Sequence, residues 1–298
     1  MEHTITDHTI TDHTITAADG RTVSYADFGE PADVPVIWCH GGPGSRHVPE
    51  AIVARARDAG IRPIGIDRPG YGESSPQPGR SIGGWVADAI LVADARGLTR
   101  FFLVGVSTGG AYALATAALE SQRVSGVLVC CGMTDMAWAV DHAMMEGNVA
   151  VSSTRDREAV KAIVIESFGE DGEKMLATDD GDLVLSAPGL AFLAAAAEQG
   201  GVMNDAPFKQ GVYGYVDDRM ADAHYNGWSS FDIADVTCPV IVIHGEQDTV
   251  VPVAHARHTA EIVTQAELRT LPEHGHFSVT GEVLEPLLDL IRSGQSAG

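Results

Sequence analysis

Residues 101–110 read FFLVGVSTGG, and this stretch decides the fold of the chain. Six residues typical of a buried parallel strand lead to Ser107, which has glycine at positions 105 and 109. Helix-forming residues 111–115 follow at once. A serine on a sharp strand-to-helix turn stands clear of its backbone, and the turn leaves no room for side chains two residues to either side. Because the helix N-terminus points N–H groups at an oxyanion formed there, the stretch predicts the nucleophile of a serine hydrolase.

Strand-like and helix-like segments alternate around this stretch. The strand-like segments are residues 22–28, 34–39, 62–67, 101–106, 124–131, 239–245 and 267–271. The helix-like segments are residues 48–59, 82–96, 111–120, 253–263 and 283–292. Residues 22–28 alternate apolar and polar side chains in the manner of an edge strand. The alternation implies right-handed crossovers and predicts an α/β fold, with a mostly parallel central sheet flanked by helices.

The alternation stops at about Met133 and resumes at about Ile233. The segment between them is rich in alanine, methionine and acidic residues, and its helical stretches include residues 156–167 and 188–199. We therefore expect a core formed by residues 20–132 and 233–298, interrupted by a mainly helical insertion at residues 133–232. Residues 1–19 form a low-complexity N-terminal arm in which HTITD repeats, and we expect it to be mobile or to add a strand rather than to bind a metal.

Composition limits the partners of the chain. The net charge is −22 and the isoelectric point is about 4.7, which argues against nucleic acid because phosphates would be repelled. No run of 18 apolar residues and no signal-peptide pattern is visible, so we expect a cytoplasmic protein that does not span a membrane. The four cysteines lack metal-ligand spacing and suit buried reduced thiols. No nucleotide-binding motif is present, so we expect no cofactor. We also expect a small-molecule substrate and no metal. The sequence does not indicate an oligomeric state.

Two later loops can supply the partners that a serine nucleophile needs. A serine hydroxyl requires a histidine base, which is itself oriented by a carboxylate. Residues 244–248, HGEQD, follow one strand-like segment, and residues 272–277, PEHGHF, follow the next. Because the carboxyl ends of parallel strands meet at one edge of a sheet, both loops should lie beside Ser107.

With Ser107, Asp248 and His276 in this order, the chain resembles the α/β-hydrolase family. The resemblance covers residues about 20–132 and 233–298, while the insertion matches the family's cap domain in placement only. It implies that Ser107 is the nucleophile, His276 the base in its G-H-F motif and Asp248 the acid in its HGxxD motif.

Two further motifs carry the same resemblance. Residues 40–44, HGGPG, look like the family's oxyanion loop, which implies that the backbone N–H groups of Gly42 and Thr108 form the oxyanion hole. Residues 67–74, DRPGYGES, resemble the turn that follows the family's next strand, and we interpret this turn as structural.

Other assignments stay open at this point. His274 is an alternative base, although it lacks the following phenylalanine. Glu246 is an alternative acid, and so is Asp135, which follows the strand-like residues 124–131.

The insertion contributes aromatic and thioether side chains that suit an apolar acyl or alcohol group. The candidate pocket residues are Met133, Trp138, Met144, Tyr213 and Trp228. We expect hydrolysis of a carboxylic ester or lactone. The first alternative is an aminopeptidase similar to proline iminopeptidases, which also show HGGPG but usually have tryptophan where this chain has Thr108. That activity needs carboxylates for the substrate's amine, and the candidates are Asp135, Asp141 and Glu146. A carbon–carbon bond hydrolase and a non-enzymatic small-ligand receptor are the remaining alternatives.

Overall fold

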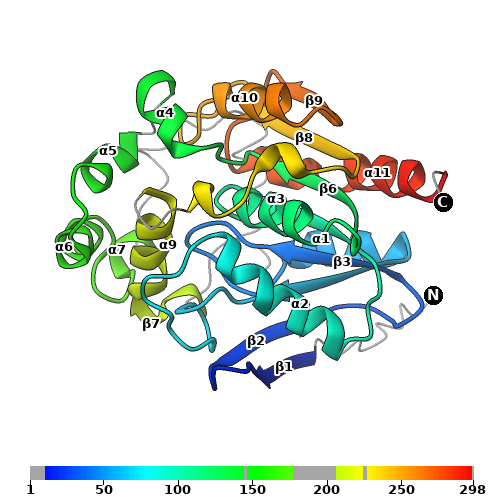
Figure 1. The fold of residues 1–298 in the computed structure, drawn as a ribbon, viewed down its shortest axis with the longest axis horizontal. Coiled ribbons are helices and arrows are strands. Elements are labelled where there is room, and N and C mark those ends of the chain that lie inside the picture. Colours follow the sequence, from blue (N-terminus) through cyan, green and yellow to red (C-terminus); the bar gives the residue numbers. More distant parts are fainter. Residues whose placement is uncertain (1–10, 144–145, 177–205, 224–226, 297–298) are drawn as a thin grey trace, which may run out of the picture.

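The computed structural model describes residues 11–143, 146–176, 206–223 and 227–296. An eight-stranded sheet forms its centre, with strand order β1-β2-β4-β3-β5-β6-β8-β9 (Figure 1). The strands are β1 (Thr11–Thr16), β2 (Thr22–Asp27), β3 (Val34–Cys39), β4 (Ile61–Ile66), β5 (Phe101–Val106), β6 (Val124–Cys130), β8 (Val240–Gly245) and β9 (Ala266–Leu271). The β1–β2 and β2–β4 pairs are antiparallel, and every other pair in this sheet is parallel. The predicted α/β class with a mostly parallel sheet is confirmed.

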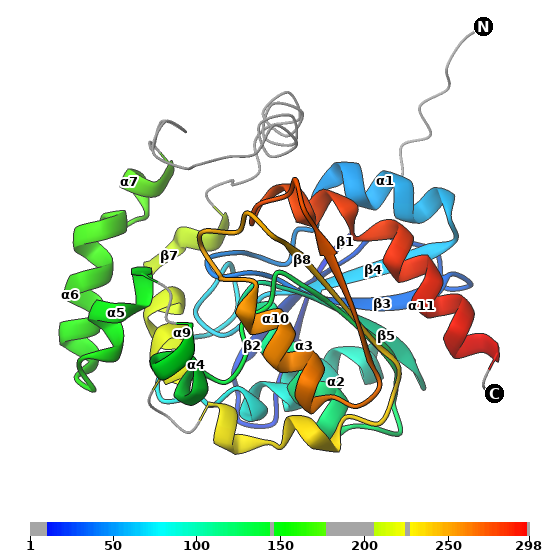
Figure 2. The same ribbon diagram turned by 90° about the horizontal axis from the view of Figure 1, so that it is seen from above.

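Helices cover both faces of the sheet (Figure 2). They are α1 (Glu50–Asp58), α2 (Val86–Ala95), α3 (Gly109–Leu119), α10 (Ala254–Ile262) and α11 (Leu284–Ser296). Alternate residues of one strand enter opposite layers, because successive side chains of a strand point to opposite faces. In β5, Leu103 packs with residues of α2 and α3, whereas Phe102 packs with residues of α1 and α11. Burial on both faces explains why the strands read as continuous apolar runs.

The expectation that residues 22–28 form an edge strand is wrong, because part of the N-terminal arm forms a further strand. Residues 22–28 look like an edge strand, but β1 pairs outside β2 and occupies the edge itself. The ring of His13 stacks on Tyr25, with 5.0 Å between centroids, and Asp12 forms an ion pair of 2.7 Å with Arg46. These tertiary contacts hold a polar repeat segment in place, and its composition alone did not reveal them.

The chain between β6 and β8 contains mostly helices where it is described. They are α4 (Met136–His142), α5 (Glu146–Ser152), α6 (Arg157–Phe168), α7 (Glu173–Leu176) and α9 (Tyr213–Ala223). A short strand, β7 (Lys209–Val212), precedes α9. This segment has a small apolar cluster of its own, which includes Val160, Phe208 and Met220. It lies at one end of the sheet (Figure 1). The helix expected at residues 188–199 lies outside the described residues.

No helix in the described ranges combines the length and the apolar character that crossing a bilayer requires.

Replacing Leu103 with alanine tests how much the packing of the central strand β5 contributes to stability. Leu103 is 0% exposed, and its truncation should lower the free energy of unfolding by about 2–5 kcal/mol, because it leaves a cavity that the neighbours fill only partly. Leu119→Ala is the matched control, since Leu119 is 49% exposed at the end of α3. Urea unfolding measures both variants, and equal losses would contradict this account of the core.

Candidate active site

Ser107 sits in a strained turn between β5 and α3. Its φ of 53° lies in the left-handed region, which is rare for residues other than glycine. Its backbone N–H donates to the carbonyl of Cys130 at 2.9 Å, which ties the turn to β6. A Cβ on Gly105 would lie 2.5 Å from the carbonyl oxygen of Gly109, and one on Gly109 would lie 2.0 Å from the carbonyl oxygen of Cys39. The turn itself therefore excludes a side chain at position 105, and β3 excludes one at position 109.

The structure brings His276 and Asp248 to Ser107. The Nε2 atom of His276 lies 3.1 Å from Ser107 Oγ, and its Nδ1 atom lies 2.8 Å from Asp248 Oδ2. The other carboxylate oxygen, Oδ1, accepts hydrogen bonds from the backbone N–H groups of Val250 and Val251 at 2.9 and 2.8 Å. Because Nδ1 donates to a carboxylate, Nε2 is free to accept the serine proton.

The surroundings of Asp248 and His276 shift the pKa values of both groups. Burial by itself raises the pKa of the Asp248 carboxyl, but hydrogen bonds from His244 and His276 outweigh it and hold that pKa well below its usual range. Burial lowers the pKa of His276, yet Cys131 and Asp248 outweigh burial and raise it to about 10. The ionised carboxylate thus favours the protonated imidazole, which is the form that a base reaches after it takes a proton.

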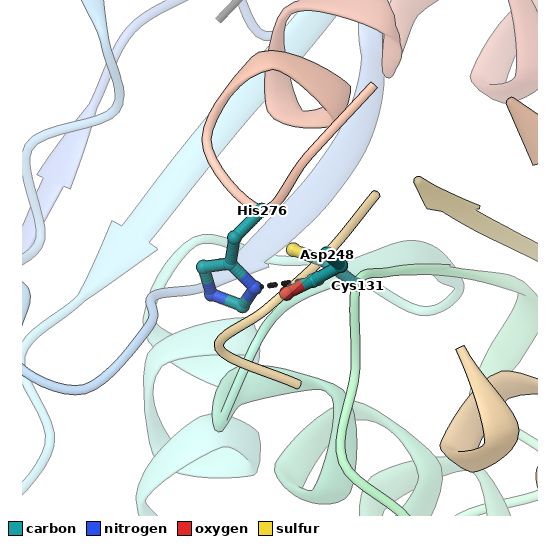
Figure 3. Close-up of side chains that lie close together, drawn as sticks. All are labelled: Cys131, Asp248 and His276. Atoms are coloured by element: carbon teal, nitrogen blue, oxygen red, sulfur yellow. Dashed lines mark hydrogen bonds and ion pairs between the residues drawn. The ribbon is translucent and has the colours of Figure 1, made fainter. Parts of the chain in front are cut away.

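Cys131 is a member of this cluster that the sequence did not reveal. Its sulfur, a carboxylate oxygen of Asp248 and a ring nitrogen of His276 all lie within 4.8 Å of one another (Figure 3). The residue has a left-handed φ of 43° directly after β6, and burial raises the pKa of its thiol. The sequence offered one indication of this position. Cys131 is the last of the strand-like residues 124–131, and the carboxyl end of a parallel strand next to residues 101–106 should lie near Ser107. These three groups are also of the types that bind zinc, but a metal here would have to displace the Asp248–His276 hydrogen bond.

The alternative base and acids make other contacts. Glu246 accepts a hydrogen bond from Thr270 at 2.8 Å, and Asp135 caps α4 by accepting from the N–H of Ala137 at 2.9 Å. For His274, the contacts found are through its backbone, which bonds Gln247 and Leu271. Among the described residues, His276 is the histidine that bonds to Ser107.

The predicted oxyanion loop also lies against the serine turn. A Cβ on Gly42 would lie 2.9 Å from Thr108 Oγ1, and one on Gly41 would lie 3.6 Å from the Cβ atom of Ser107. The main chain at Gly41 and Gly42 therefore passes beside Ser107 and Thr108.

The predicted pocket residues occupy several environments. Met133 is buried in the core, and Trp138 stacks between His142 and His258 with centroid distances of 4.8 and 3.9 Å. Trp228 lines a cavity of about 440 Å³ together with residues of α4 and Asp222.

Tyr213, a further pocket candidate, is the first residue of α9. Tyr213 faces α6, where Lys161 Nζ lies 4.8 Å from the centre of its ring. Met144 lies outside the described residues. These contacts do not decide whether the four described residues line a substrate pocket, so their assignment stays a prediction.

Comparison with known proteins adds a family to this geometry. The family described as alpha/beta hydrolase fold matches residues 34–281. A non-heme chloroperoxidase of Burkholderia pyrrocinia is 28% identical over 286 residues, covering 90% of this chain and 95% of that protein. A bifunctional esterase/perhydrolase of Acinetobacter calcoaceticus is 27% identical over 297 residues, covering 93% and 99%. A proline iminopeptidase of Neisseria gonorrhoeae is 25% identical over 295 residues, covering 90% and 91%.

Because the family match spans most of its length, the chain belongs to the α/β-hydrolase family. It is a hydrolase by class, with relatives that include an esterase and a peptidase.

Replacing Gly109 with alanine tests the close contact between α3 and β3. The added methyl group would meet the backbone of Cys39, which cannot rotate away, so the free energy of unfolding should fall by ~2 kcal/mol or more. Gly84→Ala is the control, because the nearest atom there is the rotatable Ser81 Oγ at 3.1 Å. Urea unfolding compares the two, and an unchanged Gly109→Ala protein would show that the contact is looser than described.

Proposed function

We propose that the protein hydrolyses a carboxylic ester or lactone through a covalent acyl-enzyme. The observation that carries this proposal is the hydrogen-bonded series Ser107–His276–Asp248, with distances of 3.1 and 2.8 Å. An alcohol, an imidazole and a carboxylate in this order form the arrangement that activates a serine nucleophile.

In the first step, Ser107 Oγ attacks the substrate carbonyl carbon while His276 Nε2 takes the serine proton. The backbone N–H groups of Gly42 and Thr108 stabilise the negative oxygen of the tetrahedral intermediate. His276 then gives the proton to the leaving alkoxide, which departs as an alcohol. Water, deprotonated by the same imidazole, attacks the acyl-enzyme and releases the carboxylic acid and free Ser107. Asp248 orients the imidazole and stabilises its cation throughout.

Ester cleavage is favoured over peptide cleavage by the groups around the site. Of the carboxylates that an aminopeptidase would need, Asp135 is engaged in capping α4, and Asp141 is exposed. Thr108 also occupies the position where the proline-iminopeptidase group usually has tryptophan. The aminopeptidase stays the second candidate, supported by HGGPG at residues 40–44 and by the relative of that name.

We further propose a cytoplasmic protein that acts on a small molecule without a cofactor. The net charge of −22 supports this choice of partner over nucleic acid.

Ser107→Ala tests the nucleophile. Turnover of a short p-nitrophenyl ester should fall by ~10⁴-fold or more, because the remaining oxyanion hole and binding contacts supply only the residual rate. A fluorophosphonate probe should label the wild-type protein and leave the variant unlabelled. Near-normal turnover by the variant would contradict the proposal, and faster cleavage of a prolyl arylamide than of esters would favour the aminopeptidase.

The pH dependence of kcat/KM tests the state of His276. The imidazole acts as a base only when it is neutral, and its pKa is raised above 6.5. The rate should therefore rise with pH, with a midpoint above 6.5. Asp248→Asn removes the carboxylate charge and should move the midpoint down, while kcat drops by about 10⁴-fold because the wrong tautomer forms. Stopped assays with an alkyl ester measure both, and a wild-type midpoint below 6.5 would contradict this electrostatic account.

A further inference from the structure

Helix α9 of the insertion sends Asp218 into a buried cluster in the core. Four side chains donate hydrogen bonds to this carboxylate: Arg68 at 3.2 and 2.8 Å, Arg80 at 2.5 Å, Tyr71 at 2.7 Å and Tyr112 at 2.9 Å. The side chains of Asp218, Arg68 and Arg80 are 0% exposed. Burial alone raises the pKa of Asp218, but the two guanidinium groups outweigh it and keep the carboxyl ionised. The insertion and the core therefore share one charged cluster that solvent does not reach.

Arg68 extends from this cluster to the predicted oxyanion loop. Its Nη1 atom donates to the carbonyl of His40, and its Nη2 atom donates to the carbonyl of Gly41 at 2.7 Å. The imidazole of His40 also binds the Gly41 carbonyl. It accepts from the N–H of Arg68 at 3.2 Å through Nε2, so Nδ1 carries the proton and donates to the Gly41 carbonyl at 2.6 Å. Two donors thus hold one carbonyl oxygen.

The held carbonyl belongs to the same peptide unit as the N–H of Gly42. A trans peptide is planar, with its oxygen and its hydrogen on opposite sides. The cis bond in this loop is the next one, between Gly42 and Pro43. Fixing the Gly41 oxygen on Arg68 therefore turns the Gly42 N–H away from Arg68. A donor on the carbonyl also polarises the N–H of the same amide and strengthens it as a donor.

The same helix reaches the residue that supplies the other predicted N–H group. Arg219 Nη2 donates to Thr108 Oγ1 at 2.9 Å and also pairs with Asp222. The Thr108 hydroxyl in turn lies where a Cβ on Gly42 would meet it at 2.9 Å. Consecutive residues of α9, Asp218 and Arg219, therefore support the two backbone segments beside the nucleophile.

We propose that Arg68, held by Asp218 of α9, is a positioning residue that orients the Gly42 N–H group in the oxyanion hole. Helix α9 is then part of the apparatus that stabilises the transition state, in addition to any role in covering the substrate. The inference rests on the proposed function, because it needs Ser107 to form an oxyanion intermediate.

Arg80 is a natural control for this role. It is as buried as Arg68 and bonds to the same carboxylate, but its hydrogen bonds in the described residues go to Asp218 and to the carbonyl of Gly214. Lysine at either position keeps the positive charge and loses the forked guanidinium geometry. Both substitutions weaken the hydrogen bonding to Asp218, whereas only Arg68→Lys also releases the oxyanion loop.

The experiment measures kcat, KM and thermal unfolding of both variants on the p-nitrophenyl ester. Losing an oxyanion donor lowers kcat by about 10²–10³-fold, so misorienting one in Arg68→Lys should lower kcat by about 10–100-fold with KM nearly unchanged. The inhibition constant of a trifluoromethyl ketone, whose hemiketal oxyanion occupies the hole, should rise by the same factor. Arg80→Lys should keep kcat within about threefold of wild type, although its melting temperature also falls.

The pH profile separates positioning from a general disturbance of the site. The midpoint that reports His276 should stay in place in Arg68→Lys, because Arg68 does not contact that residue within the described structure. If Arg68→Lys fails to fold, Asp218→Asn replaces it, since the neutral amide keeps the shape but weakens the hold on Arg68. The same drop in kcat and rise in inhibition constant are expected there.

The outcomes distinguish this inference from the proposed function. An active Ser107→Ala protein overturns the proposed function itself. An inactive Ser107→Ala protein leaves it standing, and the inference then fails if Arg68→Lys keeps wild-type kcat. It also fails if Arg80→Lys loses as much kcat, if the loss appears in KM alone, or if the inhibition constant does not follow kcat.

Discussion

The structure depends on the direct contact between two backbones, that of the turn after Ser107 and that of the end of β3. Nothing larger than hydrogen fits at Gly109, where a methyl group would lie 2.0 Å from the carbonyl of Cys39. This approach presses the N-terminus of α3 against the loop that leaves β3. This contact therefore keeps the serine hydroxyl, the N-terminus of α3 and the Gly41–Gly42 main chain close to one another.

The second determinant is a buried charge where α9 meets the turn of residues 67–74 and α3. An ionised carboxylate without partners in such a place is destabilising by several kcal/mol, and Asp218 is stable there because two guanidinium groups and two phenols surround it. Arg68 and Tyr71 belong to the turn of residues 67–74, Arg80 follows that turn, and Tyr112 lies in α3, so α9 docks where these segments meet. Through Arg68, the charged cluster links α9 to the main chain at His40 and Gly41, beside Ser107. Apolar packing alone would not fix the orientation of that main chain, because it is not directional.

Local patterns predicted much of this molecule. Residues 101–106 form β5 as expected, and the loops at 244–248 and 272–277 lie at the edge that their strands predicted. The choice between His274 and His276 needed three dimensions, because residues two apart in a loop differ in orientation rather than in chemistry. The edge position of residues 22–28 was wrong, since an alternating strand pattern reflects burial and cannot exclude a further strand from a polar repeat.

The sequence by itself determined the alternation of strands and helices, the glycine turn around Ser107 and the order of Ser107, Asp248 and His276 along the chain. These features follow from side-chain periodicity and from steric demands within a few residues. Only the tertiary structure decided that Cys131 lies beside His276, and that Arg68 joins Asp218 to the carbonyls of His40 and Gly41. Those contacts join residues up to 150 positions apart, and their side chains meet because the crossovers of a parallel sheet bring distant loops to one edge.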